Sequence, residues 1–305
     1  MQLSHIVDYE KLNLLNLFKN ENAFYLIKNS KILFNKYNYM NWREIYKHSS
    51  SIDFIDDIIL KEGYNSDKLY FPYIFYNKKS LHIIKHIIDY NISIEIDWDA
   101  ICYNEGLITI IDEIIFKEGY NSTKLNYNII CSNKKAIHII KNIIQNEGIF
   151  SSKLNWDMIC KNEEAIDIIN IYPQMIRMFW LCYNKNAMNI INNKIKEEGF
   201  DILHMNIFEN ENASDLIKIL IENNDIIIYY YYICENEGCV DILIDIINKE
   251  GLGSNKLYWD KLSKNKNFIK YVIENERVDI INGNVLNYNI LSENPSIFID
   301  NIDLW

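Results

Sequence analysis

Two kinds of side chain in this sequence have the types and spacing to bind a metal or act as nucleophiles: a histidine pair and six cysteines. His82 and His86 are four residues apart on an expected helix, which is the spacing of half a zinc site. No glutamate follows the first histidine, as the metalloprotease pattern His-Glu-x-x-His requires. Another copy of this segment has Thr109 and Glu113 at the same two positions, so we expect both imidazoles on an outward face. We therefore predict no metal site.

Five of the six cysteines share one recurring position, two residues before the asparagine that marks each repeat described below. They are Cys102, Cys131, Cys160, Cys182 and Cys234, whereas Cys239 follows such an asparagine by three residues. Equivalent positions on stacked repeats should be about 8–10 Å apart, which is beyond disulfide reach. We expect buried thiols that pack as small apolar side chains.

No grouping of acid, base and nucleophile stands out among the other residues. The pair Gly251 and Gly253 lacks the rest of a dinucleotide-binding fingerprint, and no glycine-rich phosphate loop occurs. The sequence therefore predicts no catalytic residue, no cofactor and no enzymatic activity.

One repeated unit provides the elements that position these side chains: aromatic-x-x-(Ile/Leu)-x-x-Asn, followed by an apolar stripe. We call the last residue of this motif the anchor. Seven clear copies have the anchors Asn77, Asn104, Asn133, Asn162, Asn236, Asn265 and Asn294, and four weaker copies have Asn20, His48, Asn184 and Asn210. Successive anchors are 22 to 29 residues apart (184 − 162 = 22; 77 − 48 = 29), a period typical of solenoids.

Each copy predicts two helices. The motif itself forms a short helix A, for which a polar residue in front of the aromatic is a good N-cap, as at Asn41, Asp97, Asn126, Asn155 and Asn287. After the anchor Asn133, apolar residues stand at offsets 3, 4, 6, 7, 10 and 11, which is one face of an α-helix, B. The period and the length of this stripe both exclude a strand.

Helix B is expected to end at a Glu-Gly pair, where glycine adopts the left-handed C′ conformation. The glycines are Gly63, Gly119, Gly148, Gly199 and Gly251. In the 22-residue interval Pro173 ends helix B instead. We further expect Asn104, Asn133 and Asn162 to hydrogen-bond backbone groups in the turn between A and B, because asparagine tolerates unusual turn dihedrals and caps helices.

A single A–B hairpin cannot bury its isoleucine face, so neighbouring hairpins must stack. The sequence predicts an all-α fold without a β-sheet: an α-solenoid of about eleven short helical repeats forming one domain over residues 1–305. The terminal copies should be atypical. His48 replaces an anchor asparagine, and Asp300 and Asn301 stand where other copies have isoleucine.

Three consecutive repeats depart from the pattern on helix A. The position after the helix-A aromatic is usually polar, and the next position is mixed. In these three copies the pair reads Phe179-Trp180, Met205-Asn206 and Tyr231-Tyr232. Stacking would align them in a partly aromatic stripe, and exposed Trp/Tyr clusters are typical binding hot spots. The commoner alternative is that Trp180 turns inward or that the tyrosines pack on a connector.

Composition excludes several classes. A formal net charge of −11 and the lack of a dense basic run argue against nucleic acid as a partner. The longest apolar stretch, Ile226 to Cys234, has nine residues, whereas a membrane span needs about 20. The first residues show no signal peptide, which favours an intracellular protein without membrane attachment.

Two segments carry a family resemblance. Trp259–Asn265 (WDKLSKN) and Ile290–Phe298 (ILSENPSIF) resemble the W-x-x-L-S-x-N-P-x-A-I repeats of giant nucleocytoplasmic DNA virus proteins, and the Asn/Ile-rich composition fits an AT-rich genome. Ile233–Gly251 is similar to an ankyrin repeat from its first helix onward. No copy has the ankyrin Thr-Pro-Leu-His opening, so we expect ankyrin-like stacking without β-hairpins.

This resemblance implies a repeat architecture and assigns no catalytic residue. It favours a non-enzymatic protein–protein interaction scaffold or adaptor of viral origin, in the host cytoplasm or the virion, with one or more protein partners. The alternative is a structural component of a virion or its assembly, which a strong tendency to self-assemble would favour.

Overall fold

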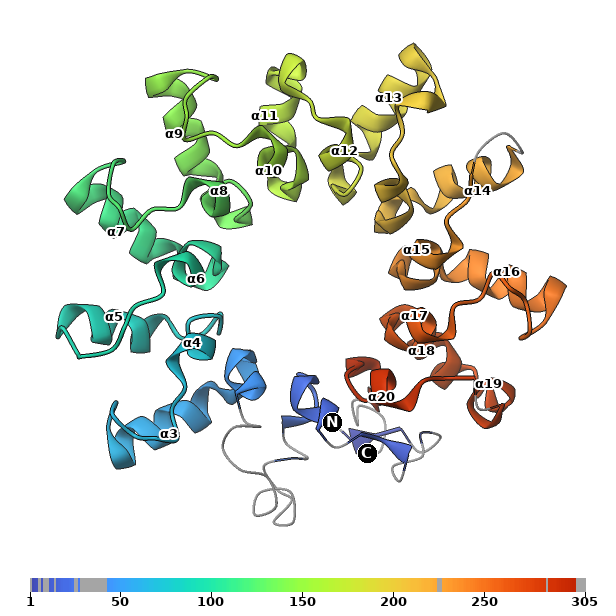
Figure 1. Cartoon of the computed structure of the whole chain (residues 1–305), viewed down its shortest axis with the longest axis horizontal. Coiled ribbons are helices and arrows are strands. Elements are labelled where there is room, and N and C mark those ends of the chain that lie inside the picture. Colours follow the sequence, from blue (N-terminus) through green and yellow to red (C-terminus); the bar gives the residue numbers. More distant parts are fainter. Residues whose placement is uncertain are drawn as a thin grey trace, which may run out of the picture. The chain divides into compact units, whose positions relative to one another are not determined.

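The protein consists of two compact helical units in a computed structural model, which describes residues 2–4, 7, 11–13, 15–24, 27, 43–223, 227–283 and 285–299. One unit spans residues 42–203 and the other combines residues 1–41 with residues 204–305 (Figure 1). The predicted all-α class is confirmed for the described residues, apart from one short ladder. In it β1 (Gln2–Leu3) pairs antiparallel with β2 (Phe298–Ile299), where we expected no sheet.

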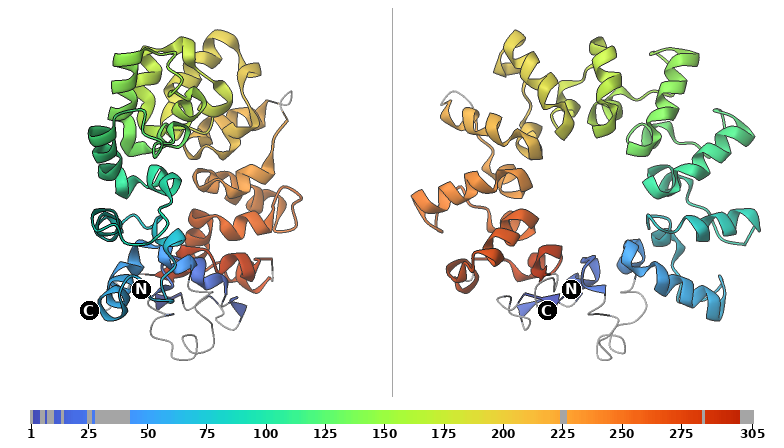
Figure 2. Two further views of the ribbon diagram at one scale, coloured as in Figure 1. Left: turned by 60° about the vertical axis from the view of Figure 1, so that its left-hand side comes forward. Right: turned by 180° about the vertical axis from the view of Figure 1, so that it is seen from behind.

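In the unit spanning residues 42–203, short A helices alternate with longer B helices. Within this unit the A helices follow one another along one side and the B helices along the other (Figure 1, Figure 2). The A helices are η4 (Glu44–Lys47), α4 (Phe71–Ile74), α6 (Trp98–Tyr103), α8 (Tyr127–Ile130), α10 (Trp156–Lys161) and α12 (Met178–Leu181). The B helices are α3 (Ile52–Glu62), α5 (Leu81–Asp89), α7 (Ile108–Glu118), α9 (Ile137–Glu147), α11 (Ile166–Ile171) and α13 (Met188–Glu198).

The other unit has the same alternation. Its A helices are η2 (Asn16–Lys19), η12 (Met205–Glu209), α15 (Tyr230–Glu235), α17 (Trp259–Lys264) and α20 (Tyr288–Leu291). Its B helices are α14 (Ser214–Glu222), α16 (Val240–Glu250) and α18 (Lys266–Glu274), and α19 (Val278–Asn282) is an additional short helix. In both panels of Figure 2 the dark-blue N-terminal segment lies beside the red C-terminal helices.

A 3₁₀ turn follows most anchors and begins most of the B helices, although the turn after Asn294 leads into β2 instead. The side chain of an anchor asparagine caps each of these turns except the turn after His48. These turns are η5 (Ser49–Ser51), η6 (Glu105–Leu107), η7 (Lys134–Ala136), η8 (Glu163–Ala165), η10 (Lys185–Ala187), η13 (Glu211–Ala213), η14 (Glu237–Cys239) and η15 (Pro295–Ile297). Two further 3₁₀ helices, η9 (Pro173–Met175) and η11 (Phe200–Ile202), follow B helices. Sequence periodicity did not separate these turns from the α-helices behind them, because both share one apolar face.

The expected caps of helix A are largely confirmed. The Asp97 carboxylate accepts a hydrogen bond from the Ala100 N–H (2.9 Å), and the Asn155 and Asn287 side chains also accept from the first turns of their helices. Asn126 differs, since its amide instead donates to Asp99 Oδ1 (3.0 Å). The fifth expected cap, at residue 41, lies outside the described residues, as do the atypical positions 300 and 301.

The apolar stripe of helix B forms the core. In α9 the side chains of Ile139, Ile140 and Ile143 are buried, at offsets 6, 7 and 10 from the anchor, and Ala136 at offset 3 is buried as well. Ile137 and Ile144, at offsets 4 and 11, are only half-buried. The predicted helical face is therefore correct, although its edges remain partly accessible.

The Glu-Gly helix ends are present, but their conformation differs from the predicted one. Gly119 ends α7 with φ 79° and ψ 177°, and Gly148 ends α9 with φ 83° and ψ 173°. The positive φ was expected, whereas the extended ψ places both glycines outside the left-handed helical region, in a region that is essentially restricted to glycine. In the shortest interval α11 ends at Ile171 just before Pro173, as predicted.

The anchor asparagines connect neighbouring hairpins. The Asn162 Oδ1 accepts from the Glu164 N–H (3.1 Å), which is the expected bond within the turn. Its Nδ2 donates to the carbonyl oxygens of Cys131 (3.0 Å) and Asn133 (3.2 Å) in the preceding hairpin. The same donor pattern recurs at Asn77, Asn104, Asn184, Asn236 and Asn265. Asn294 differs slightly, since its Nδ2 donates to the carbonyl oxygens of Ser263 and Lys264, the residues two and one before the preceding anchor. The prediction for the turn is thus correct but incomplete, because it missed the bonds between hairpins.

Candidate functional site

Aromatic side chains gather on α12, in the unit spanning residues 42–203. Phe179 is 40% exposed, Trp180 is half-buried, and their ring centroids are 5.0 Å apart in an edge-to-face arrangement. The Tyr183 ring lies 6.2 Å from each of them. We call Phe179, Trp180 and Tyr183 the α12 cluster. Its exposure follows from the helix itself, because Leu181 and the next residue, Cys182, face the core.

A lysine completes the α12 cluster. The Nζ of Lys161, from the end of α10, lies 5.9 Å from the Trp180 ring centroid and 4.8 Å from that of Tyr183. An ammonium over an aromatic face is attracted by the ring quadrupole, at about 0.5–1 kcal/mol for exposed pairs. Ring–ring and cation–ring contacts therefore hold the α12 cluster in place.

A second group of rings lies on α15, in the other unit. Tyr231 is 44% exposed and packs edge-to-face against Tyr232 (5.4 Å) and against Tyr258 from the next hairpin (5.5 Å). Tyr232 is half-buried and also contacts Tyr229 at 6.3 Å. We call Tyr229, Tyr231, Tyr232 and Tyr258 the α15 cluster.

Lys261 contacts a ring of the α15 cluster, as Lys161 contacts rings of the α12 cluster. Its Nζ lies 4.3 Å from the Tyr231 ring centroid and also pairs with Glu235. Burial alone would lower the pKa of Lys261, but hydrogen bonds to Glu235 and Tyr231 outweigh it and raise this pKa. The ammonium is therefore held charged at this surface.

The five residues of the predicted stripe are not equivalent. None of Phe179, Trp180, Met205, Tyr231 and Tyr232 is buried, so the expected exposure is present. Met205 is 44% exposed at the start of η12, whereas Asn206, its pair in the sequence alignment, is buried. This helix A is a 3₁₀ helix, which changes the direction of successive side chains. Phe179 and Trp180 belong to one unit and the other three residues to the other.

Sequence reasoning missed a row of side chains directly before the anchors. Tyr76 and Tyr103 are exposed and lie 6.0 Å apart on neighbouring hairpins, and the Lys47 Nζ lies 6.0 Å from the Tyr76 ring. Tyr183 and Lys161 occupy the same position in their own hairpins. The sequence does show an aromatic or basic residue directly before several anchors. It does not show that these side chains contact one another, because the contact forms only when two hairpins pack side by side.

His82 and His86 lie on an exposed face and the cysteines are buried, as the sequence predicted. His82 Nε2 lies 2.8 Å from Asp56 Oδ1, and the His86 ring stacks on Tyr64 at 5.1 Å. All six cysteines are buried, and none of them forms a disulfide. Burial raises the pKa of Cys131 to about 11, although the hydrogen bond from the Asn155 backbone N–H lowers it in part. Among the described residues no group of three His, Cys, Asp or Glu side chains has the geometry to hold a metal ion.

A hollow of about 630 Å³ lies between α4 and α6 in the unit spanning residues 42–203. Its lining includes the rings of Phe71 and Trp98 and the carboxylates of Asp97 and Asp99. The Asp97 carboxylate caps α6 and the Asp99 carboxylate accepts from Asn126, so both have structural partners.

Comparison with protein-family models, with curated proteins and with solved structures finds no match to this chain. Within the part of the chain that the structure describes, no helix combines the length and the apolar character that crossing a bilayer requires.

Proposed function

We propose that this chain is a non-enzymatic protein-binding scaffold, an α-solenoid of about eleven stacked hairpins that binds a protein partner with its A helices. The observation that carries this proposal is the pair of pre-ordered, partly exposed ring clusters on α12 and α15. Each cluster is held by edge-to-face ring contacts and by one lysine. Such clusters lose little side-chain entropy on binding, which is why aromatic residues dominate interface hot spots.

The anchor bonds support the stacked arrangement. Asn133 donates to the hairpin before it and Asn162 to the hairpin of Asn133, so the same contact is repeated from one copy to the next. In a solenoid each repeat contacts mainly its neighbours, and the accumulated surface becomes an extended binding face. The giant-virus origin and the intracellular location implied by the resemblance stay predictions.

The test is quantitative affinity capture with the full-length chain as bait, in extracts of cells that produce it. Trp180→Ala and Tyr231→Ala should each lose the same captured protein, with melting temperatures close to that of the parent chain. Phe116→Ala is the matched control, because Phe116 is 91% exposed on a B helix, α7, and should retain this protein.

Loss of the captured protein in all three variants, or in none of them, would contradict the proposal. A collapse of the fold in Trp180→Ala would show that this ring serves the core. If the parent chain forms only large, open-ended assemblies of itself, the structural-component alternative gains the support instead.

A further inference from the structure

The N-terminal segment, described between Gln2 and Ile27, contacts the last hairpin as one repeat contacts the repeat before it. The Asn20 Nδ2 donates to the carbonyl oxygens of Ser292 (3.2 Å) and Asn294 (2.8 Å). Within the array the Asn265 Nδ2 donates to those of Cys234 (3.1 Å) and Asn236 (3.0 Å). In both cases the acceptors are an anchor and the residue two positions before it.

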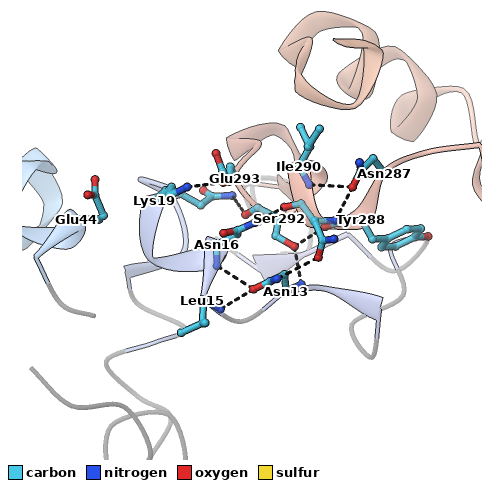
Figure 3. Close-up of polar contacts among 12 residues, drawn as sticks. Asn13, Leu15, Asn16, Lys19, Glu44, Asn287, Tyr288, Ile290, Ser292 and Glu293 are labelled. Atoms are coloured by element: carbon cyan, nitrogen blue, oxygen red, sulfur yellow. Dashed lines mark hydrogen bonds and ion pairs between the residues drawn. The ribbon is translucent and has the colours of Figure 1, made fainter. Parts of the chain in front are cut away.

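Four further contacts repeat this register, and Figure 3 shows several of them. Each of these four contacts has a counterpart between consecutive hairpins. Asn13 makes two of them: its N–H donates to Ser292 Oγ (2.7 Å) as that of Asn287 does to Ser263 Oγ (2.8 Å), and its Nδ2 donates to Asn289 Oδ1 (3.0 Å) as that of Asn155 does to Asn128 Oδ1 (2.9 Å). The Asn22 Nδ2 donates to the Pro295 carbonyl oxygen (3.1 Å), as that of Asn267 does to the Glu237 carbonyl oxygen (3.0 Å). The ion pair between Lys19 and Glu293 corresponds to the one between Lys264 and Glu235.

The apolar side chains of the segment follow the same pattern. Leu17 and Phe18, three and two residues before the anchor Asn20, are buried like the Ile-Cys pairs of other hairpins. Ala23 and Ile27, at offsets 3 and 7, are buried as their helix-B equivalents are. The first repeat in the sequence therefore packs on the last repeat in the way that each repeat packs on the one before it.

The contact between the N-terminal segment and the last hairpin differs from the contacts between consecutive hairpins in the length of chain that joins the two partners. The bonded residues are 272 to 279 positions apart, whereas within the array the corresponding bonds span 22 to 31 positions. A short connector therefore joins consecutive hairpins, whereas no short connector joins the N-terminal segment to the last hairpin. Recognition depends on the surfaces alone, and a second copy of the chain carries identical surfaces.

We propose that the N-terminal segment is an exchangeable repeat, which docks on the last hairpin of its own chain or on that of a second copy. Reciprocal exchange satisfies every contact in both copies and closes a dimer, as in domain swapping. The balance depends on the concentration of chains relative to the effective concentration of the tethered segment. This inference goes beyond the scaffold proposal and does not depend on it.

The experiment uses two full-length variants, Asn16→Cys and Asn289→Cys, produced together in one cell with different tags. The Asn16 Nδ2 lies 2.9 Å from the Asn289 carbonyl oxygen, so a short bismaleimide can join the two positions. All six native cysteines are buried, which limits other reactions. We expect a covalent heterodimer after capture on both tags, with a peptide map that joins positions 16 and 289. Its yield should rise with expression level.

Two controls make the result decisive. A chain that carries both substitutions should cross-link internally, because the contact also forms within one copy. Adding Asn20→Asp to the Asn16→Cys chain removes the buried amide donor and should lower the heterodimer yield severalfold. If the double variant cross-links internally but no heterodimer forms, exchange does not occur. If neither link forms, the contact itself is refuted.

Discussion

At the scale of single residues, the anchor asparagine is the side chain on which the arrangement depends. Its side-chain oxygen Oδ1 accepts a hydrogen bond in the turn after helix A, and its amide nitrogen Nδ2 donates to the preceding hairpin. At Asn104 the acceptors are the carbonyl oxygens of Phe75 (2.8 Å) and Asn77 (3.0 Å). Aspartate lacks the donor, and glutamine would place its amide one carbon further away. This dual role explains why the motif ends in asparagine.

Replacing Asn133 by alanine should lower the free energy of unfolding by about 1–3 kcal/mol. The buried side chain bonds the Lys135 N–H (2.9 Å) and the Cys102 carbonyl oxygen (2.9 Å), and truncation leaves these groups unsatisfied. Denaturant titration measures the change. Asn142→Ala is the control, since Asn142 is exposed on α9 and its replacement should change little. Equal stability of the two variants would show that the anchor asparagine reflects only the Asn-rich composition and does not stabilise the fold.

Asn133→Asp separates the two roles of the anchor. The carboxylate can still accept from the Lys135 N–H, but it cannot donate to the Cys102 carbonyl oxygen and faces it with like partial charge. We expect the same titration to give a loss at least as large as for alanine. A loss much smaller than that of alanine would mean that only the local turn matters.

The sequence revealed the anchors because their spacing is regular, and it correctly predicted the local bond. It did not reveal the acceptors in the preceding hairpin, since these are backbone carbonyls whose position depends on stacking. Exposure of Phe179 and Tyr231 followed from their alignment with polar residues in other copies. The contact between Tyr76 and Tyr103 did not, because it requires two hairpins to be placed side by side.

At the scale of elements, helix B and its end could be predicted, whereas the finer geometry could not. The apolar period of 137–144 determines the buried face of α9, and glycine after glutamate marks its end. The ψ angle near 180° at that glycine follows from the connector, in which Ser151 Oγ donates to Glu147 (2.6 Å) and the Lys153 Nζ pairs with the same carboxylate. These partners lie four and six residues away, and periodicity does not show them.

Gly119→Ala should lower the free energy of unfolding by about 1–3 kcal/mol, because φ 79° with ψ 177° is strained for any side chain. Gly253→Ala is the matched control. An added Cβ meets nothing within 4 Å at either glycine, but only Gly119 has a positive φ. Thermal melting of both variants isolates the backbone contribution. Equal melting temperatures would contradict the assigned conformation.

The connectors also predict a dependence of stability on pH. Hydrogen bonds from Lys124 and Ser122 hold the pKa of Glu118 below its ordinary value of 4.5, and equivalent partners lower those of Glu62, Glu147 and Glu250. A lowered folded-state pKa stabilises the fold above the ordinary value, and this contribution is lost as the pH falls through the folded-state pKa. Melting temperature should therefore decline below pH 4.5. Replacing all four glutamates by glutamine should make the decline smaller, and an unchanged decline would refute this origin.

At the scale of the whole molecule, the repeat pattern predicted helical hairpins but not the partner of the first one. Asn20 was identified as an anchor from its spacing, but the spacing did not indicate which hairpin its side chain contacts. The structure instead places it against Ser292 and Asn294. A contact between residues more than 270 positions apart has no local signal in a single sequence.

The central claim is that anchor amides bind one hairpin to the next, and that Asn20 continues this series after Asn294. Hydrogen exchange of side-chain amides, followed by NMR on protein with isotope-labelled asparagine, tests it most directly. Nine anchors should form a slowly exchanging set: Asn20, Asn77, Asn104, Asn133, Asn162, Asn184, Asn236, Asn265 and Asn294. Each signal is assigned by its loss in the corresponding aspartate variant. Anchor amides that exchange as fast as that of the exposed Asn142 would contradict the account.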